Sequence, residues 1–210
     1  MRRSPLASLM ATISRRPPGA ATWLLLLGLG AALGCGRRQP APAPEAAPGP
    51  TAPRVMPLAK VSVLETSGPP PPDTSVTFTT GSPHAIVLYH GGESITFARL
   101  TFAAAAFGDS GRTVEVKVHP RPGIYGLDFN TSLPLRGSEA AVTFEYTRYF
   151  SASARARRVY GSDVAFERAL AVGRLLPDNQ LELLPSTRPQ ADNLRAALPE
   201  PGSYLVAGPE

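Results

Sequence analysis

From residue 59 onwards, the chain consists of short runs in which hydrophobic and polar positions alternate. The clearest run is Val114–Val118, where the valines fall on one face while Glu115 and Lys117 fall on the other. Val142–Tyr146 repeats the pattern. Because the side chains of a strand point alternately to opposite faces, this period predicts strands with one buried face. We expect further strands at these positions: 61–64, 76–78, 85–89, 95–97, 100–102, 180–184 and 203–207.

Segments rich in glycine and proline separate these runs and supply the turns between them. Short strands joined by such turns are typical of antiparallel sandwiches, so the sequence predicts an all-β fold, an antiparallel immunoglobulin-like β-sandwich. The most continuously apolar run, 85–89, favours a central strand. Segment 153–176 can be helix or strand, because Ser162 would cap a helix that buries Phe166, whereas 171–175 can continue as strand. We expect this segment to be rich in strand.

The first 34 residues follow a different pattern, in which basic residues precede one apolar run. Four arginines occur without any acidic residue, and the apolar run spans 20–33. A helix of about 14 residues is about 21 Å long, shorter than a hydrocarbon core of about 30 Å. The pattern therefore predicts a cleaved signal peptide, residues 1–34, whose translation can start at Met1 or at Met10.

The predicted signal peptide ends in Ala32-Leu33-Gly34, and Cys35 follows as the only cysteine of the chain. This tetrapeptide resembles the bacterial lipobox, in which a small residue precedes an invariant cysteine, although Ala32 stands where leucine is commoner. The resemblance implies cleavage before Cys35, a diacylglycerol thioether on its sulfur, and acylation of the new amino terminus, hence a lipoprotein anchored in a bacterial membrane. Gly36 follows in place of aspartate, which implies the outer membrane of the cell envelope. The alternative is an ordinary signal peptide with an incidental cysteine.

Residues 35–58 combine this cysteine with a segment rich in proline and alanine. Such a composition buries too little apolar surface to fold, and proline favours extended polyproline conformations. We therefore expect a disordered tether, which serves either as a spacer or as a segment that an aromatic groove recognises. The remaining residues, 59–210, are enough for one domain with its own core.

A second resemblance rests on five segments of this domain: Leu100–Phe107, Val114–Val118, Val142–Tyr146, Leu181–Thr187 and Pro201–Ala207. Their order is similar to that of a β-sandwich family that occurs in zonula occludens proteins, netrin receptors and ankyrins. The opening turn departs from that family, because Ala104-Ala105 stand where the family has Pro-Gly. The resemblance implies an interaction or structural module without catalytic residues.

The formal net charge of +5 suggests a nucleic-acid-binding protein only until its distribution is considered. The signal peptide holds four basic residues, and the tether adds Arg37, Arg38 and Arg54 against Glu45. The domain from residue 59 onwards is therefore nearly neutral, and we expect no nucleic-acid partner. The arginines of the tether instead suit anionic lipid headgroups.

Residue types that carry catalysis are sparse in this sequence. A single cysteine excludes a disulfide framework within the chain, and there is no Gly-x-Ser-x-Gly nucleophile motif. The three histidines, His84, His90 and His119, adjoin proline or glycine in expected loops and are too scattered for a metal site. We therefore expect no catalytic residue, no metal ion and no cofactor.

One cluster of side chains remains as a candidate site for a partner. It places four aromatic residues and four arginines within a short stretch: Tyr146, Arg148, Tyr149, Phe150, Arg155, Arg157, Arg158 and Tyr160. Arginine forks beside aromatic rings suit sugars and anionic groups. The alternative is a strand end with a buried aromatic face and a solvated arginine-rich loop.

Together, these features predict a non-catalytic, membrane-anchored lipoprotein of the bacterial envelope whose domain binds a partner protein or a glycan. The alternative is a purely structural accessory subunit of an envelope or export complex. The sequence leaves the oligomeric state open.

Overall fold

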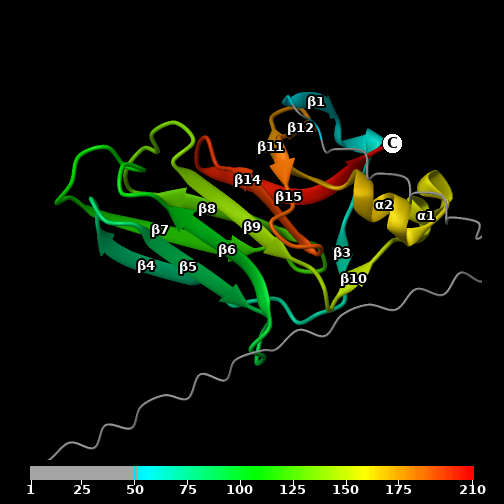
Figure 1. Cartoon of the computed structure of the whole chain (residues 1–210), viewed down its shortest axis with the longest axis horizontal. Helices are drawn as coiled ribbons and strands as arrows, with labels where there is room; N and C mark the ends of the chain where they lie inside the picture. The colour runs from blue at the N-terminus through cyan, green and yellow to red at the C-terminus, as the bar shows by residue number, and fades with distance from the viewer. Residues whose placement is uncertain (1–49, 51) are drawn as a thin grey trace, which may run out of the picture. The chain divides into compact units, whose positions relative to one another are not determined.

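The computed structural model describes residues 50 and 52–210, which lie within a compact unit formed by residues 44–210. This part consists mostly of antiparallel β-strands with few helices, as the alternating pattern predicts (Figure 1). None of its helices is long and apolar enough to span a membrane. The predicted signal peptide, Cys35 and most of the predicted tether lie outside the described residues.

The strands form two larger sheets and one small strand pair. The first sheet has the order β1-β12-β11-β15-β8-β7-β4, with β2 beside β15. Its strands are β1 (Arg54–Pro57), β2 (Val61–Val63), β4 (Thr74–Thr79), β7 (Thr113–Pro120), β8 (Gly126–Thr131), β11 (Ala171–Leu176), β12 (Gln180–Leu183) and β15 (Gly202–Pro209).

The second sheet has the order β13-β14-β9-β6-β5. Its strands are β5 (His84–Tyr89), β6 (Thr96–Phe102), β9 (Ala140–Glu145), β13 (Ser186–Thr187) and β14 (Asn193–Ala197). The strand pair consists of β3 (Glu65–Thr66) and β10 (Phe150–Ser151), and the helices are the 3-10 turn η1 (Leu58–Lys60), α1 (Ala154–Tyr160) and α2 (Asp163–Ala169).

The two larger sheets share one hydrophobic core. The valines of β7 are all fully buried, whereas Glu115 is half-buried and Lys117 is exposed. Val142 and Phe144 of β9 reach the same core from the second sheet. Because full burial of such a side chain contributes about 1.5–3 kcal/mol, the alternation along β7 determines which of its faces turns toward the second sheet.

A smaller core forms where β1, β12 and β15 meet. Met56 of β1 packs there with Leu181 of β12 and Leu205 of β15. The first strand begins at Arg54, so the folded part includes residues 54–58, which the sequence analysis assigns to the tether. The sequence does not predict this strand, because it contains proline and arginine and Met56 is its only buried side chain.

Both cores and the strand pairings of the described part lie between residues 54 and 209. They fall within the compact unit 44–210. A fragment spanning 44–210 therefore contains the packing on which the fold depends, and we expect it to fold on its own. It lacks Cys35, the only cysteine of the chain, and so it suits cysteine variants.

The prediction of a central strand at 85–89 is wrong. Among the residues that the structure describes, strand β5 is the last strand of the second sheet and pairs only with β6. Its inner side chains Ile86 and Leu88 are buried, but Tyr89 is 47% exposed. An uncharged run shows that a strand has apolar faces, and it does not show how many neighbours that strand has. The two strands expected at 95–97 and 100–102 form the single strand β6, because Ala98 between them is also buried.

The expectation of strand for the first part of segment 153–176 is also wrong, because α1 and α2 occupy it. Ser153 and Ser162 precede the two helices, and each serine oxygen accepts a hydrogen bond of 3.1 Å from the backbone N–H three residues later. Gly161 ends α1 with φ 75°, a left-handed conformation that glycine adopts readily. The alternative of a helix capped by Ser162 is confirmed, and strand resumes at β11.

Candidate partner-binding surface

The predicted cluster begins at Tyr146, which lies in the core after the end of β9. Its side chain is 1% exposed, and its hydroxyl donates a hydrogen bond of 3.3 Å to the Glu167 carboxylate. Arg188 donates both to the Tyr146 hydroxyl and to the backbone carbonyl oxygen of Glu167. Burial raises the pKa of Tyr146 to about 12. Tyr146 therefore holds α2 against the end of β9 and is not accessible to a partner.

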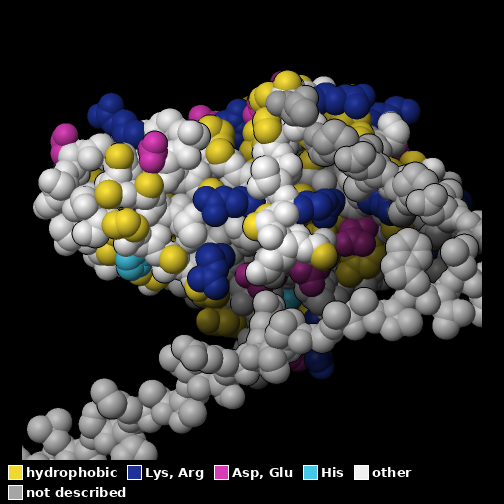
Figure 2. Space-filling view, viewed as in Figure 1, with side chains coloured by type: hydrophobic (Ala, Val, Ile, Leu, Met, Phe, Trp, Pro, Cys, Tyr) yellow, Lys and Arg dark blue, Asp and Glu magenta, His cyan; other side chains and the backbone are white. Residues whose placement is uncertain are grey.

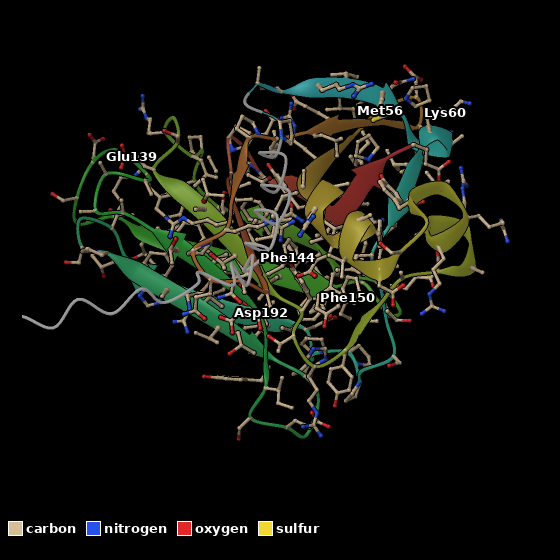
Figure 3. The ribbon with its side chains drawn as sticks, turned by 45° about the vertical axis from the view of Figure 1, so that its right-hand side comes forward. Met56, Lys60, Glu139, Phe144, Phe150 and Asp192 are labelled. Atoms are coloured by element: carbon tan, nitrogen blue, oxygen red, sulfur yellow. The ribbon has the colours of Figure 1, made fainter. Side chains whose placement is uncertain are left out.

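Tyr149 and Phe150 lead the chain from β9 toward α1, and both pack against the main core. Figure 3 labels Phe150 on this connection. The Tyr149 hydroxyl donates to the Glu93 carboxylate at 2.6 and 2.7 Å, and this hydrogen bond raises the pKa of Tyr149. The Phe150 ring centroid lies 5.9 Å from that of Tyr146. Arg148 is exposed, with its guanidinium carbon 5.9 Å from the Tyr149 ring centroid, a cation–π contact. These aromatic side chains therefore fasten the connection to the core.

His90 lies beside Tyr149 and outside any strand, as predicted, whereas His84 and His119, also predicted in loops, lie within β5 and β7. His90 follows β5 directly and is 1% exposed. Its ring meets those of Phe97 and Tyr125 edge to face, at centroid distances of 5.3 and 6.1 Å. Its Nδ1 lies 2.9 Å from the Pro69 carbonyl oxygen, so Nδ1 carries a proton. Within residues 50 and 52–210, neither its Nε2 nor the Tyr125 hydroxyl has a hydrogen-bond partner. His90 is therefore a core residue.

Helix α1 is attached to the first sheet through its last residue, Tyr160. The Tyr160 hydroxyl donates to the Pro209 carbonyl oxygen of β15, and its ring centroid lies 5.2 Å from that of Phe166. Burial raises the pKa of Tyr160 to about 12. Gly208 leaves room for this contact, because a Cβ there would lie 2.6 Å from the Tyr160 hydroxyl oxygen.

The three arginines of α1 differ in how they are held. Arg155 forms an ion pair of 2.6 Å with Glu210 and also donates to a carbonyl oxygen of η1, while Arg157 forms an ion pair of 2.9 Å with Asp163. The hydrogen bond to each carboxylate raises the pKa of its arginine, and the bond from Arg155 lowers the pKa of Glu210. Arg158 is exposed and forms no ion pair with another residue of the described part.

The exposed side chains of the two helices define what we call the α1 surface: Arg155, Arg157, Arg158, Val159, Val164 and Arg168. The helices pack against each other, and the Arg157–Asp163 ion pair joins them. Val159 and Val164 are 46% and 54% exposed, although valine is usually buried. Arg155 and Arg157 are paired with Glu210 and Asp163, so the positive charge of the α1 surface comes from Arg158 and Arg168.

Basic side chains also lie elsewhere on the domain, as the separate dark blue positions in Figure 2 show. In the second sheet, Arg99 of β6 and Arg195 of β14 are both in register with Thr143 of β9. Both arginines are exposed, so positive charge alone does not distinguish the α1 surface. The exposed valines do distinguish it, because they add an apolar contact area beside the charge.

The structure thus divides the predicted cluster. Arg155, Arg157 and Arg158 lie together on α1, whereas the aromatic residues make the packing contacts described above. Val164 and Arg168 of α2 join the surface and were not predicted. The helix alternative starting at Ser162 contained the signal for them, because it places both residues away from Phe166.

No group of three or more His, Cys, Asp and Glu side chains within residues 50 and 52–210 is arranged to hold a metal ion. No known protein family, curated protein or solved structure matches the chain significantly. The α1 surface is therefore assessed on its own geometry.

Proposed function

We propose that this chain is a non-catalytic lipoprotein of the bacterial envelope, anchored in the outer membrane through Cys35, whose domain binds an envelope glycan or a partner protein through the α1 surface. The observation that carries the proposal is an arginine-rich helix pair with exposed valines on the outside of a well-packed domain. Arginine forks suit phosphate and carboxylate groups, and the valines suit the apolar parts of such a partner. The resemblance of Ala32–Cys35 to a lipobox supports the anchor.

For the domain itself, we propose an immunoglobulin-like β-sandwich related to the family of zonula occludens proteins, netrin receptors and ankyrins. Two antiparallel sheets with a shared core support this assignment. The five segments that carry the resemblance overlap β6, β7, β9, β12 and β15. An interaction module without catalytic residues agrees with a binding role.

The anchor is tested in the full chain produced in a bacterium. We expect the protein to sediment with membranes and to incorporate radioactive palmitate, and we expect Cys35→Ala to lose both properties. Gln39→Ala, four residues further along the tether, serves as the control and should behave as the unmodified chain. Labelling that persists in Cys35→Ala would contradict the anchor.

The α1 surface is tested with the fragment 44–210 on beads coated with lipopolysaccharide and on purified peptidoglycan sacculi. Arg158→Glu combined with Arg168→Glu is the informative variant, because neither arginine is engaged in an ion pair within the described part. An arginine near an anionic surface contributes about 1 kcal/mol, so replacing both should weaken binding by at least about 30-fold.

Arg99→Glu combined with Arg195→Glu provides the matched control, since it makes the same charge change on the second sheet. Binding that falls equally in both double variants would indicate unspecific attraction and contradict the α1 surface. If the fragment binds neither material, cross-linking from position 159, an exposed valine of the same surface, should recover a protein partner in the native envelope. Recovery that is unaffected by Arg155→Ser, Arg157→Ser and Arg158→Ser together would refute the binding role.

A further inference from the structure

Two of the sheet edges in the described part carry features that prevent pairing with another strand. Strand β1, at one edge of the first sheet, contains Arg54 and Pro57. Strand β13, at one edge of the second sheet, has two residues and is followed by Arg188 and Pro189. Charge, proline and short length are common ways in which proteins protect the edge of a sheet.

At the opposite edges of the same sheets, such features lie only at the strand ends: Pro72 and Asp73 precede β4, Pro83 precedes β5, and β5 ends in a bulge. Strands β4 and β5 each have six residues, and neither contains proline, lysine, arginine, aspartate or glutamate. They lie together on one side of the domain, where Phe78 of β4 stacks on His84 of β5 with a centroid distance of 4.0 Å (Figure 1). Toward the end of β5 there is a groove of about 340 Å³. Pro72 and Thr74 line one side of it, and residues 87–94 line the other. The free edge of β5 is therefore reached from solvent.

The side chains of β5 are apolar on both faces of the sheet. Ile86 and Leu88 are buried in the core. Ala85, Val87 and Tyr89 lie on the outer face of the sheet. The register with β6 shifts between Leu88 and Tyr89, so the irregularity is confined to the end of the strand. A regular, uncharged edge with an exposed tyrosine is a template for pairing with a further strand.

We propose that β5 pairs with β5 of a second copy of this chain, antiparallel and centred on Val87. In this register Val87 faces its own copy, Ile86 faces Leu88, and Ala85 faces Tyr89. Each pair places two uncharged side chains on the same face, and the large tyrosine ring covers the small alanine. The two five-stranded sheets then form one continuous sheet across a two-fold axis, the commonest symmetry of homo-oligomers.

The sequence of β5 disfavours the alternative registers. A shift by one residue would bring an inner side chain opposite an outer one. A pairing centred on Ile86 preserves the faces but sets Pro83 opposite Tyr89, where proline cannot donate a hydrogen bond. In the register centred on Val87 every facing pair within β5 is uncharged and lies on one face, so a second copy offers β5 a matching strand.

The register is tested by cross-linking the fragment 44–210 carrying Val87→Cys, in which this cysteine is the only one. Facing residues of antiparallel strands have Cα atoms about 4.5 or 5.5 Å apart, within the range of about 4.4–6.8 Å that a disulfide accepts. We expect most of the protein to become a covalent dimer under mild oxidation. Val164→Cys, on the exposed face of α2, is the control and should form no covalent dimer under the same oxidation.

The oligomeric state is measured by analytical ultracentrifugation of the unmodified fragment, which we expect to be a dimer. Val87→Lys should be monomeric at the same concentration, because it sets two ammonium groups against each other, while Val164→Lys should remain a dimer. Circular dichroism checks that the variants are folded. If Val87→Lys does not fold, the comparison of cross-linking in Val87→Cys and Val164→Cys tests the pairing instead. A monomeric unmodified fragment, equal cross-linking of both cysteine variants, or a dimer that survives in folded Val87→Lys would overturn the proposal.

Discussion

The contact between Tyr160 and Gly208 determines how closely α1 approaches β15, and its energy can be measured. A Cβ at Gly208 would lie 2.6 Å from the Tyr160 hydroxyl oxygen and 3.3 Å from Cε2 of Phe166. Phe166 is fully buried and cannot move freely. The φ angle of Gly208 is not in the left-handed region, so the cost of an added methyl group is steric. We therefore expect Gly208→Ala to lower the free energy of unfolding by about 1–3 kcal/mol.

Tyr160→Phe removes the oxygen atom that causes this clash. Alone, the variant also loses the hydrogen bond to the Pro209 carbonyl oxygen and should lower the free energy of unfolding by about 0.5–1.5 kcal/mol. In the double variant, the contacts that limit the added methyl group are those of 3.3 Å with Cε2 of Phe166 and with Cζ of residue 160. We expect the double variant to be more stable than the sum of the single changes predicts, with a coupling energy of about 1 kcal/mol.

The assay is urea unfolding of the fragment 44–210 and its three variants, followed by circular dichroism. Tyr204→Phe provides the control background, because the Tyr204 hydroxyl donates to the Glu200 carbonyl oxygen at 2.7 Å and does not contact Gly208. Gly208→Ala should cost the same with or without Tyr204→Phe. If Gly208→Ala also costs the same with or without Tyr160→Phe, the hydroxyl does not limit the space at β15 and the reasoning is refuted.

Three further predictions concern polar groups around the α1 surface and the core. The buried Tyr125 hydroxyl has no partner in the described part, so Tyr125→Phe should change the free energy of unfolding by less than about 0.5 kcal/mol, whereas Tyr204→Phe should lower it by about 1 kcal/mol in the same urea assay. The lowered pKa of Glu210 means that its stabilising contact with Arg155 is complete above the ordinary carboxyl pKa and is lost as pH falls through the lower pKa of the folded state. The protection of the α1 amides against hydrogen exchange, corrected for the intrinsic exchange rate at each pH, should therefore fall over that range, and Glu210→Gln should weaken this pH dependence. Arg188→Met leaves the Glu167 carbonyl oxygen and the Tyr146 hydroxyl with fewer hydrogen-bond partners. We expect it to lower the free energy of unfolding by about 2 kcal/mol and the melting temperature by about 4–8 °C. An unchanged melting temperature would contradict the role of Arg188.

The sequence predicts those parts of the fold that depend on local alternation. The valines of β7 identify its buried face without any knowledge of the second sheet, because burial of alternate side chains follows from the strand period. The two helices were harder to predict, since each has seven residues and depends on tertiary contacts such as those of Tyr160 and Phe166. Their serine caps were visible in the sequence, but a cap alone does not decide between a short helix and a turn.

The candidate surface was predictable only in part, for the same reason. Spacing along the sequence groups Tyr146 with Arg158, but it does not show that the aromatic side chains pack against the core. Ion pairs over long sequence separation, such as Arg155 with Glu210, also cannot be derived from local pattern. The α1 surface therefore emerges only when the contacts that hold α1 are known, and these contacts leave Arg158 and Arg168 exposed.

The failed prediction for β5 carries information about assembly. An apolar, uncharged run does not determine how many neighbours a strand has, but it lacks the charged side chains that keep an edge strand from pairing. In the single chain β5 has one neighbour, so its free edge offers unpaired backbone groups and an exposed tyrosine to solvent. Strands β1 and β13 show that this chain protects other edges with charge, proline or short length. Pairing of β5 with a second copy would cover an edge that this strand leaves without charge or proline of its own.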